Sequence, residues 1–162
     1  MTAQSVQEEL ELKTAERIWA VNSEYLRCVV QQTVPRDTYE AGTLLHGAYG
    51  TPFVSVSSIL PESIVEGSGW HNRDLIIRPV TVVIYGDRLS VDPDPGLYKM
   101  IRERAVRSIQ KFRWELEQAN SCVWYGNVRH QSQLSAAAWI QQGRFISAFD
   151  VLFRTQEPRL HT

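Results

Sequence analysis

The feature that most constrains the fold is a run of residues that is apolar on both of its alternating sides. The run follows Pro79 and consists of Val80, Thr81, Val82, Val83, Ile84 and Tyr85. A strand with this pattern must be covered on both faces, so it predicts the centre of a sheet. Pro79 has no amide hydrogen to donate to a ladder, and we expect it to mark the start of this strand or a bulge.

Three further segments have the pattern of strands. Residues 53–60 are rich in β-branched side chains and end at Pro61, and a second strand is predicted near residues 122–130. The third strand, over residues 144–155, alternates clearly. Its apolar face would carry Phe145, Phe149, Val151 and Phe153, and its polar face Arg144, Asp150 and Arg154.

Two helices are predicted. Residues 6–32 lack Gly and Pro, and apolar residues such as Ala15 and Ile18 recur at helical spacing. The second helix is expected to start with Asp94 as its cap and Pro95 in its first position, and to continue to about residue 118. Its apolar stripe would consist of Leu97, Ile101, Ala105, Ile109, Phe112 and Leu116.

The order of these elements predicts an α+β fold: a mostly antiparallel sheet of about four strands, with two main helices packed on one face. The 162 residues fit one domain, spanning 1–162. Two long loops are expected, over residues 36–51 and 62–73. The C-terminal residues 157–162 show no core-forming pattern and are expected to form a mobile tail.

Charge and composition exclude several classes of function. The formal net charge is -1, so the whole molecule has no field that attracts a polyanion or a membrane surface. The longest apolar run, residues 75–85, is about half of the ~20 residues that a membrane-spanning helix needs. The first twelve residues lack the pattern of a signal peptide, so we expect a protein made in the cytoplasm.

Cys28 and Cys122 are expected to be buried free thiols, one in the first helix and one at a strand start.

No motif for catalysis, cofactor binding or metal binding is present in the sequence, so the prediction is a protein that is not an enzyme. The four histidines are scattered and have no ligand at metal spacing. His71 and Asp74 form the constellation most like an active site, but loops of soluble proteins commonly carry such residues. Asp92 and Asp94 are explained as turn and cap residues rather than cation ligands.

Two surface features are open to two interpretations each. The second helix carries an excess of basic residues from Lys99 to Arg113. One interpretation is that they contact the phosphates of a nucleic acid. The other is that they form a solvated face or a salt-bridged contact between subunits. Tyr39, Tyr49 and Trp70 lie in the two long loops and are candidate interface residues, because aromatic side chains are enriched at interface hot spots. Alternatively, the loops fold back and cover the sheet.

The order of elements and four segments together resemble the tail-terminator or tail-completion proteins at the neck of tailed bacteriophages. The segments are PFVSVSSILPES, RPVTVVIYGD, LYKMIRERAVRSIQKF and GRFISAFDVLFRTQ. The resemblance implies a structural subunit of the virion that forms a ring, typically a hexamer, with copies of itself. The ring would close the tail tube, join it to the neck connector and let DNA pass without specific binding. The resemblance assigns no functional role to any individual residue.

Two other classes remain as alternatives. One is a small protein that binds nucleic acid or processes it with a metal ion, using the basic helix and carboxylates such as Glu66, Asp74 and Asp87. The other is a bacterial oligomeric scaffold with the same fold and no viral role. Particle size would separate a ring-forming neck protein from a nucleic-acid-binding monomer.

Overall fold

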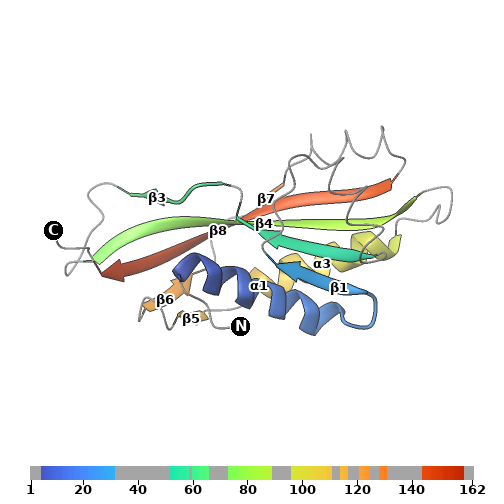
Figure 1. The fold of residues 1–162 in the computed structure, drawn as a ribbon, viewed down its shortest axis with the longest axis horizontal. Coiled ribbons are helices and arrows are strands. Elements are labelled where there is room, and N and C mark those ends of the chain that lie inside the picture. Colours follow the sequence, from blue (N-terminus) through green and yellow to red (C-terminus); the bar gives the residue numbers. More distant parts are fainter. Residues whose placement is uncertain are drawn as a thin grey trace.

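The structure is a computed structural model of the chain, and it describes residues 5–31, 52–58, 60–65, 73–88, 96–110, 114–116, 121–124, 128–130 and 144–158. Figure 1 shows an elongated molecule in which two long strands run along its length. The elements in chain order are α1 (Val6–Asn22), β1 (Cys28–Gln31), β2 (Phe53–Ser57), β3 (Ser63–Ile64), β4 (Arg73–Arg88), α3 (Gly96–Gln110), β5 (Trp114–Leu116), β6 (Ser121–Trp124), β7 (Val128–His130) and β8 (Arg144–Pro158).

The α+β class is confirmed, but the prediction of about four antiparallel strands is wrong. In the described part of the chain the sheet has eight strands in the order β1-β2-β4-β8-β6-β5, with β3 beside β4 and β7 beside β8. The sheet is mixed, because β1 runs parallel to β2 while the other pairs are antiparallel. The strands that the sequence did not reveal have two to four residues each, too few for an alternating pattern to be read.

The centre of the sheet is a ribbon formed by β4 and β8. The two strands pair from Arg73 with Pro158 to Arg88 with Arg144, and their register shifts only between Tyr85 and Arg88. With 16 and 15 residues they exceed the usual strand length of about five to six. The predicted alternation is confirmed: Val80, Val82 and Ile84 lie in one apolar cluster, and Val83 and Tyr85 in another on the opposite face.

Pro79 is inside β4 and marks neither a strand start nor a bulge, in contrast to our expectation. It pairs with Leu152 of β8 in unbroken register. On the other edge of β4, β3 pairs up to Ile77 and β2 only from Thr81, so no described strand lies beside Pro79 there. The carbonyl oxygen of Pro79 accepts a hydrogen bond of 2.9 Å from the side-chain amide of Gln7. In a strand the amide and carbonyl of one residue point to the same edge, so the missing N–H of Pro79 lies where the ladder has a gap.

Both helices pack on one face of the sheet, as predicted. The main core joins Leu10 and Ile18 of α1 to Ile101 and Ile109 of α3, all with no exposed surface. The predicted apolar face of β8 is confirmed, because Phe145, Phe149, Val151 and Phe153 lie in this same core. On the opposite face Phe53 stacks on Tyr85, with ring centroids 4.6 Å apart.

The first helix is shorter than predicted. Ser5 caps it, since its hydroxyl accepts a hydrogen bond of 3.2 Å from the amide of Glu8. It ends at Asn22, whose carbonyl oxygen accepts bonds from the amides of Tyr25 and Leu26. The residues that follow form β1, so Cys28 lies in a strand and not in a helix. The predicted helix was too long because residues 6–32 contain no Gly or Pro that would mark the turn after Asn22.

The second helix begins at Gly96, directly after Pro95, in agreement with the predicted start, while Asp94 and Pro95 lie outside the described residues. Ile101, Ala105 and Ile109 of the predicted stripe are fully buried, but Leu97 is 37% exposed. The helix ends at Gln110 rather than near residue 118, and residues 114–116 form β5.

Two of the predicted irregular segments contain ordered strand. The loop predicted over residues 62–73 includes β3, which pairs with Ile76 and Ile77 of β4. The tail predicted over residues 157–162 overlaps β8, which includes Glu157 and Pro158. Glu157 is only 9% exposed and pairs with the half-buried Arg78 of β4. This pairing across the sheet cannot be read from the sequence of the tail alone.

Candidate functional site

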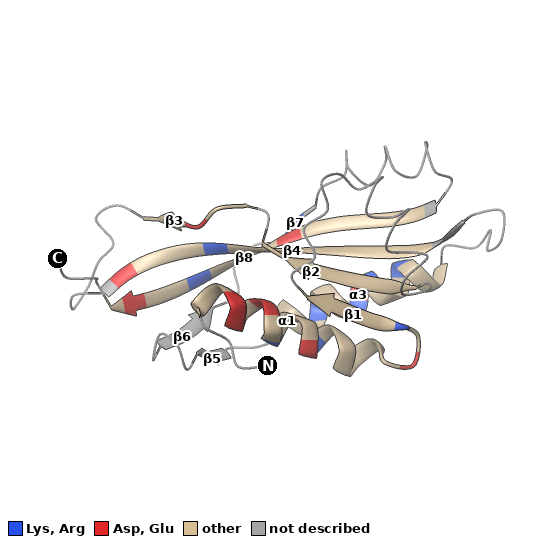
Figure 2. Cartoon of the chain, viewed as in Figure 1, with Lys and Arg blue, Asp and Glu red and all other residues tan. Residues whose placement is uncertain are grey.

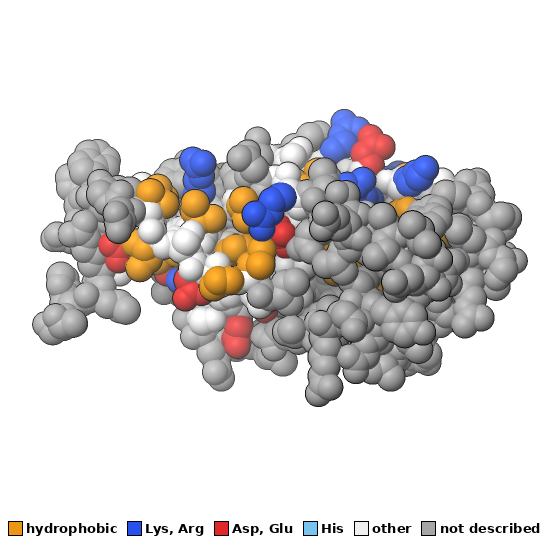
Figure 3. Space-filling view, turned by 90° about the horizontal axis from the view of Figure 1, so that it is seen from above, with side chains coloured by type: hydrophobic (Ala, Val, Ile, Leu, Met, Phe, Trp, Pro, Cys, Tyr) orange, Lys and Arg blue, Asp and Glu red, His pale blue; other side chains and the backbone are white. Residues whose placement is uncertain are grey.

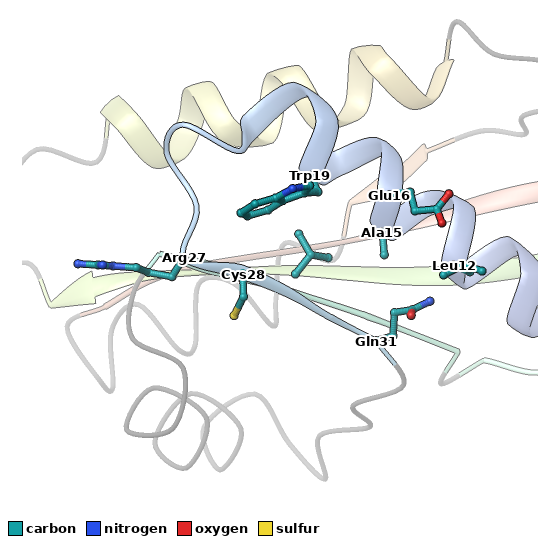
Figure 4. Close-up of a pocket in the computed structure, with 8 residues that line it drawn as sticks. Leu12, Ala15, Glu16, Trp19, Arg27, Cys28 and Gln31 are labelled. Carbon is teal, nitrogen blue, oxygen red and sulfur yellow. The ribbon is translucent and has the colours of Figure 1, made fainter. Parts of the chain in front are cut away.

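A groove lies between the first helix and the edge strand β1. Its volume is about 350 Å³, and Figure 4 shows its lining side chains arriving from the two elements. The helix contributes Leu12, Ala15, Glu16 and Trp19, and the strand side contributes Arg27, Cys28, Val29 and Gln31. Leu12, Ala15 and Trp19 share one side of α1 because they are three and four residues apart. The result is an apolar groove with charged residues at its rim.

Trp19 is the unusual residue of this groove. Its side chain is 43% exposed, although Trp is among the side chains that gain most from burial. In Figure 4 the indole lies on the α1 side of the groove, across from β1. The Cys28 side chain points away from Trp19 and packs against the cluster of Phe53 and Tyr85. Burial raises the pKa of its thiol, so the thiol stays protonated at neutral pH. The groove therefore has the properties of a binding surface for an apolar side chain.

The strand that lines the groove is also an edge of the sheet. β1 pairs with β2 through four residues, and no other strand in the described part of the chain pairs with it. The amide of Arg27, just before β1, donates a hydrogen bond of 2.8 Å to the carbonyl of Pro52 and so fixes the start of the strand. An edge strand presents backbone donors and acceptors to any extended segment that approaches it.

A polar cluster joins the ribbon to α1, and we call it the ribbon lock: Gln7, Glu11, Ser58, Arg78 and Glu157. The guanidinium of Arg78 donates to both carboxylate oxygens of Glu157, at 2.7 and 2.8 Å. The amide of Gln7 donates to the Ser58 hydroxyl at 2.7 Å, and that hydroxyl donates to Glu11. Arg78 also donates a hydrogen bond of 3.5 Å to the side-chain oxygen of Gln7, so the lock joins α1, β4 and β8, which are distant in sequence.

The charge state of Glu157 follows from its partners. Burial by itself raises the pKa of this carboxyl, but hydrogen bonds from Arg78 and Thr155 and the charge of Arg78 lower the pKa below its ordinary value overall. Thr155 donates its hydroxyl hydrogen to Glu157 from the same strand. Glu157 is therefore ionised at neutral pH, and its negative charge is matched inside the lock.

Asp150 is the most buried carboxylate on the opposite face of the sheet, with no exposed surface. It lies on the predicted polar face of β8, but this face is covered at that position. The hydroxyl of Thr81 donates a hydrogen bond of 2.7 Å to Asp150, and Arg129 of β7 forms an ion pair with it at 3.4 Å. Its described contacts hold β7 against the ribbon.

The basic residues of α3 are partly occupied by partners in the same chain. Figure 2 shows Lys and Arg on α3, whereas most charged residues of the neighbouring α1 are acidic. Arg104 donates a hydrogen bond of 3.2 Å to the carbonyl of Val21, near the end of α1, and its guanidinium lies 5.3 Å from the ring centre of Tyr25. Arg107 pairs with Glu103 on the exposed surface at 3.6 Å. These contacts agree with a solvated face that also holds the two helices together.

The candidate interface residues Tyr39, Tyr49 and Trp70 lie outside the described residues, as do His71, Asp92 and Asp94. The side chain of Cys122 is also outside the described part. Within that part, no three metal-ligating side chains gather at one place. Neither described helix is long and apolar enough to cross a bilayer.

Sequence reasoning missed Trp19 and Ile64, the two most exposed large hydrophobic side chains in the described part, at 43% and 62%. The spacing of Leu12, Ala15 and Trp19 along α1 was the available signal for the groove. No signal marked Ile64, because β3 is too short to show a pattern.

No family model matches this chain, and no curated protein matches it. Two solved structures are similar. One is a chain of the virion of the native gene transfer agent particle, with a TM-score of 0.50, 12% sequence identity and coverage of 94% of both chains. The other is described as the sheath/tube terminator of an extracellular contractile injection system, PVC, in the extended state. Its TM-score is 0.41 at 9% identity, over 100% of this chain and 62% of that chain. The first similarity shows a shared fold.

Proposed function

We propose that this protein is a structural subunit of a phage-type tail, which assembles with copies of itself into a ring at the neck. The observation that carries the proposal is the fold shared with a chain of the gene transfer agent virion over 94% of both chains. The ring closes the tail tube and joins it to the connector, and DNA passes through its opening. The four sequence segments that resemble tail-terminator proteins support the same assignment.

The shape of the molecule also supports assembly. A subunit of a ring needs two different contact surfaces, one for each neighbour. The chain has an apolar groove beside an edge strand, and a long ribbon that extends past the helices (Figure 1). The paired Arg78 and Glu157 join the two strands of this extension to each other. Contact surfaces that are ordered before association lose less entropy when they bind.

The proposal is tested with the purified protein by sedimentation over a concentration series and by negative-stain electron microscopy. We expect a single larger species at high concentration and ring-shaped particles with a central opening. A protein that stays monomeric at its highest soluble concentration, with and without magnesium, contradicts the proposal. Retention of labelled DNA by that monomer in a gel-shift assay would favour the nucleic-acid-binding alternative.

A further inference from the structure

Two exposed apolar side chains lie beside edge strands at different ends of the molecule. Trp19 lines the groove beside β1, and Ile64 projects from β3 with 62% of its surface exposed. Single exposed apolar side chains are common in proteins and need no explanation by themselves. Here each accompanies an edge strand, because β3 pairs with β4 on one side and no second partner occurs in the described residues.

The twist of the ribbon separates these two edges. β2 and β3 pair with the same edge of β4, at residues 81–85 and 76–77. Figure 1 shows β3 above β4 at one end and β2 and β1 below it at the other, as expected for a long twisted strand. The two edge strands therefore face opposite sides of the molecule. A contact between them in two copies is head-to-tail, and such contacts propagate into a ring when the rotation closes.

The surroundings of β3 are apolar as well. Ile64 lies across from Ile76 and shares its face of the sheet. The half-buried Leu75, Ile77 and Leu152 lie on the other face. In Figure 3 hydrophobic side chains gather toward the end of the molecule where β3, β4 and β8 lie, with basic side chains among them. β3 therefore has apolar side chains on both faces of the sheet around it, and exposed apolar surface is common at sites of protein contact.

One pair of opposite charges is available across the two surfaces. Glu62 precedes β3 and is exposed, while Arg27 is exposed at the rim of the groove. The rim also carries Glu16, on the helix side, so the two ends of the groove differ in charge. An extended segment that enters beside β1 with its acidic residue near Arg27 is thereby oriented.

We propose that β3 of one copy docks in the groove between α1 and β1 of a second copy. The side chain of Ile64 enters the groove against Trp19, Glu62 pairs with Arg27, and the backbone of β3 adds to the edge of β1 as an extra strand. The proposal rests on the proposed function, because it names the contact through which the ring forms. The groove, at about 350 Å³, holds an aliphatic side chain with room for its neighbours.

The first test compares Ile64→Asp with Leu97→Asp by sedimentation. Both residues are exposed and apolar, at 62% and 37%, so both variants should melt like the wild type. We expect Ile64→Asp to raise the protein concentration needed for half-assembly by roughly tenfold or more, as for loss of a hot-spot contact. Leu97→Asp should leave this concentration unchanged. Wild-type assembly by Ile64→Asp would overturn the docking while leaving the ring proposal intact.

The second test reverses the charges. Glu62→Arg and Arg27→Glu should each weaken assembly, and the double variant should recover it. A mixture of the two single variants should also assemble, because each kind of copy then meets an opposite charge on the other. Weakened single variants without recovery in the double variant or in the mixture would overturn the pairing of Glu62 with Arg27. A wild-type protein that does not assemble overturns the docking and the proposed function together.

Discussion

The carboxylate of Glu157 accepts two hydrogen bonds from the guanidinium of Arg78, across two strands whose positions differ by 79 residues. Both side chains are nearly buried, with exposed fractions of 11% and 14%. The loss of one partner of such a pair leaves an unpaired charge in a nearly buried position, which is strongly destabilising. The stability of the ribbon near Arg78 and Glu157 should therefore be sensitive to single substitutions.

We expect Glu157→Gln to destabilise the protein by about 2–3 kcal/mol, because Arg78 keeps its charge in a nearly buried position. Urea denaturation followed by circular dichroism measures the change in the free energy of unfolding. Glu103→Gln is the matched control, since it breaks the exposed pair with Arg107 and should cost less than about 0.5 kcal/mol. Equal effects of the two variants would show that the lock does not stabilise the ribbon.

The stabilisation by Glu157 should depend on pH in a defined direction. The pKa of this carboxyl is lower in the folded protein than in the unfolded chain, so its contribution is complete above the unfolded value, near 4.3. The contribution declines as the pH falls below that value and is lost once the pH passes the folded pKa. The difference in unfolding free energy between the wild type and Glu157→Gln should therefore shrink on acidification. A constant difference down to strongly acidic pH would contradict the assigned charge state.

Gly86 should not tolerate a side chain. A Cβ at this position would lie 2.8 Å from two ring carbons of Tyr98 and 3.0 Å from the Cβ of Phe145. The rings of Tyr98 and Phe145 pack together with centroids 5.3 Å apart, so neither can move freely. We expect Gly86→Ala to cost about 1–3 kcal/mol by overpacking, whereas Gly96→Ala at the exposed start of α3 should be nearly neutral. Thermal melting of both variants tests this expectation, and an unchanged midpoint for Gly86→Ala would count against it.

Ile109 tests the packing of α3 on the sheet. Its side chain has no exposed surface and lies in the main core. Ile109→Asp buries an unpaired carboxylate and should leave the chain largely unfolded, while Ile109→Val should cost about 0.5–1.5 kcal/mol. In thermal melting, Ile109→Asp should lose the cooperative transition and Ile109→Val should keep it. A soluble Asp variant with wild-type melting would place this residue outside the core.

Trp70 stays a candidate interface residue from the sequence. If its loop contacts a neighbouring subunit, Trp70→Ala should leave the melting temperature nearly unchanged and weaken assembly by ~2 kcal/mol or more. Melting and light scattering on the same sample separate the two effects. A large loss of stability with assembly retained would place Trp70 in the core of the monomer.

The elements predicted from the sequence are those in which apolar side chains recur at a regular spacing, over several helical turns or along a strand. The alternation from Val80 to Tyr85 and the spacing of Ile101, Ala105 and Ile109 both reflect burial against the same core, and the structure places them there. The sequence did not separate β1 from α1, because the segment between Asn22 and Cys28 contains no Gly or Pro and its turn is closed by hydrogen bonds to the carbonyl of Asn22.

The groove and the ribbon lock could not be predicted from the sequence, for a different reason. Both arise from residues that only the tertiary structure brings together: Trp19 with Val29, and Arg78 with Glu157. Glu157 looked like part of a mobile tail, since a single charged residue near a chain end has no periodic pattern. Pairing of β8 with β4 through Pro158 extended the order to this point.

Assembly into a ring is tested by the mass of the wild-type protein, measured by native mass spectrometry beside Ile64→Asp. We expect one closed assembly of fixed stoichiometry, a hexamer by the resemblance to tail terminators, and its loss in the variant. A wild-type spectrum that contains only monomer, or a two-fold dimer that Ile64→Asp leaves intact, would contradict a ring built from head-to-tail contacts.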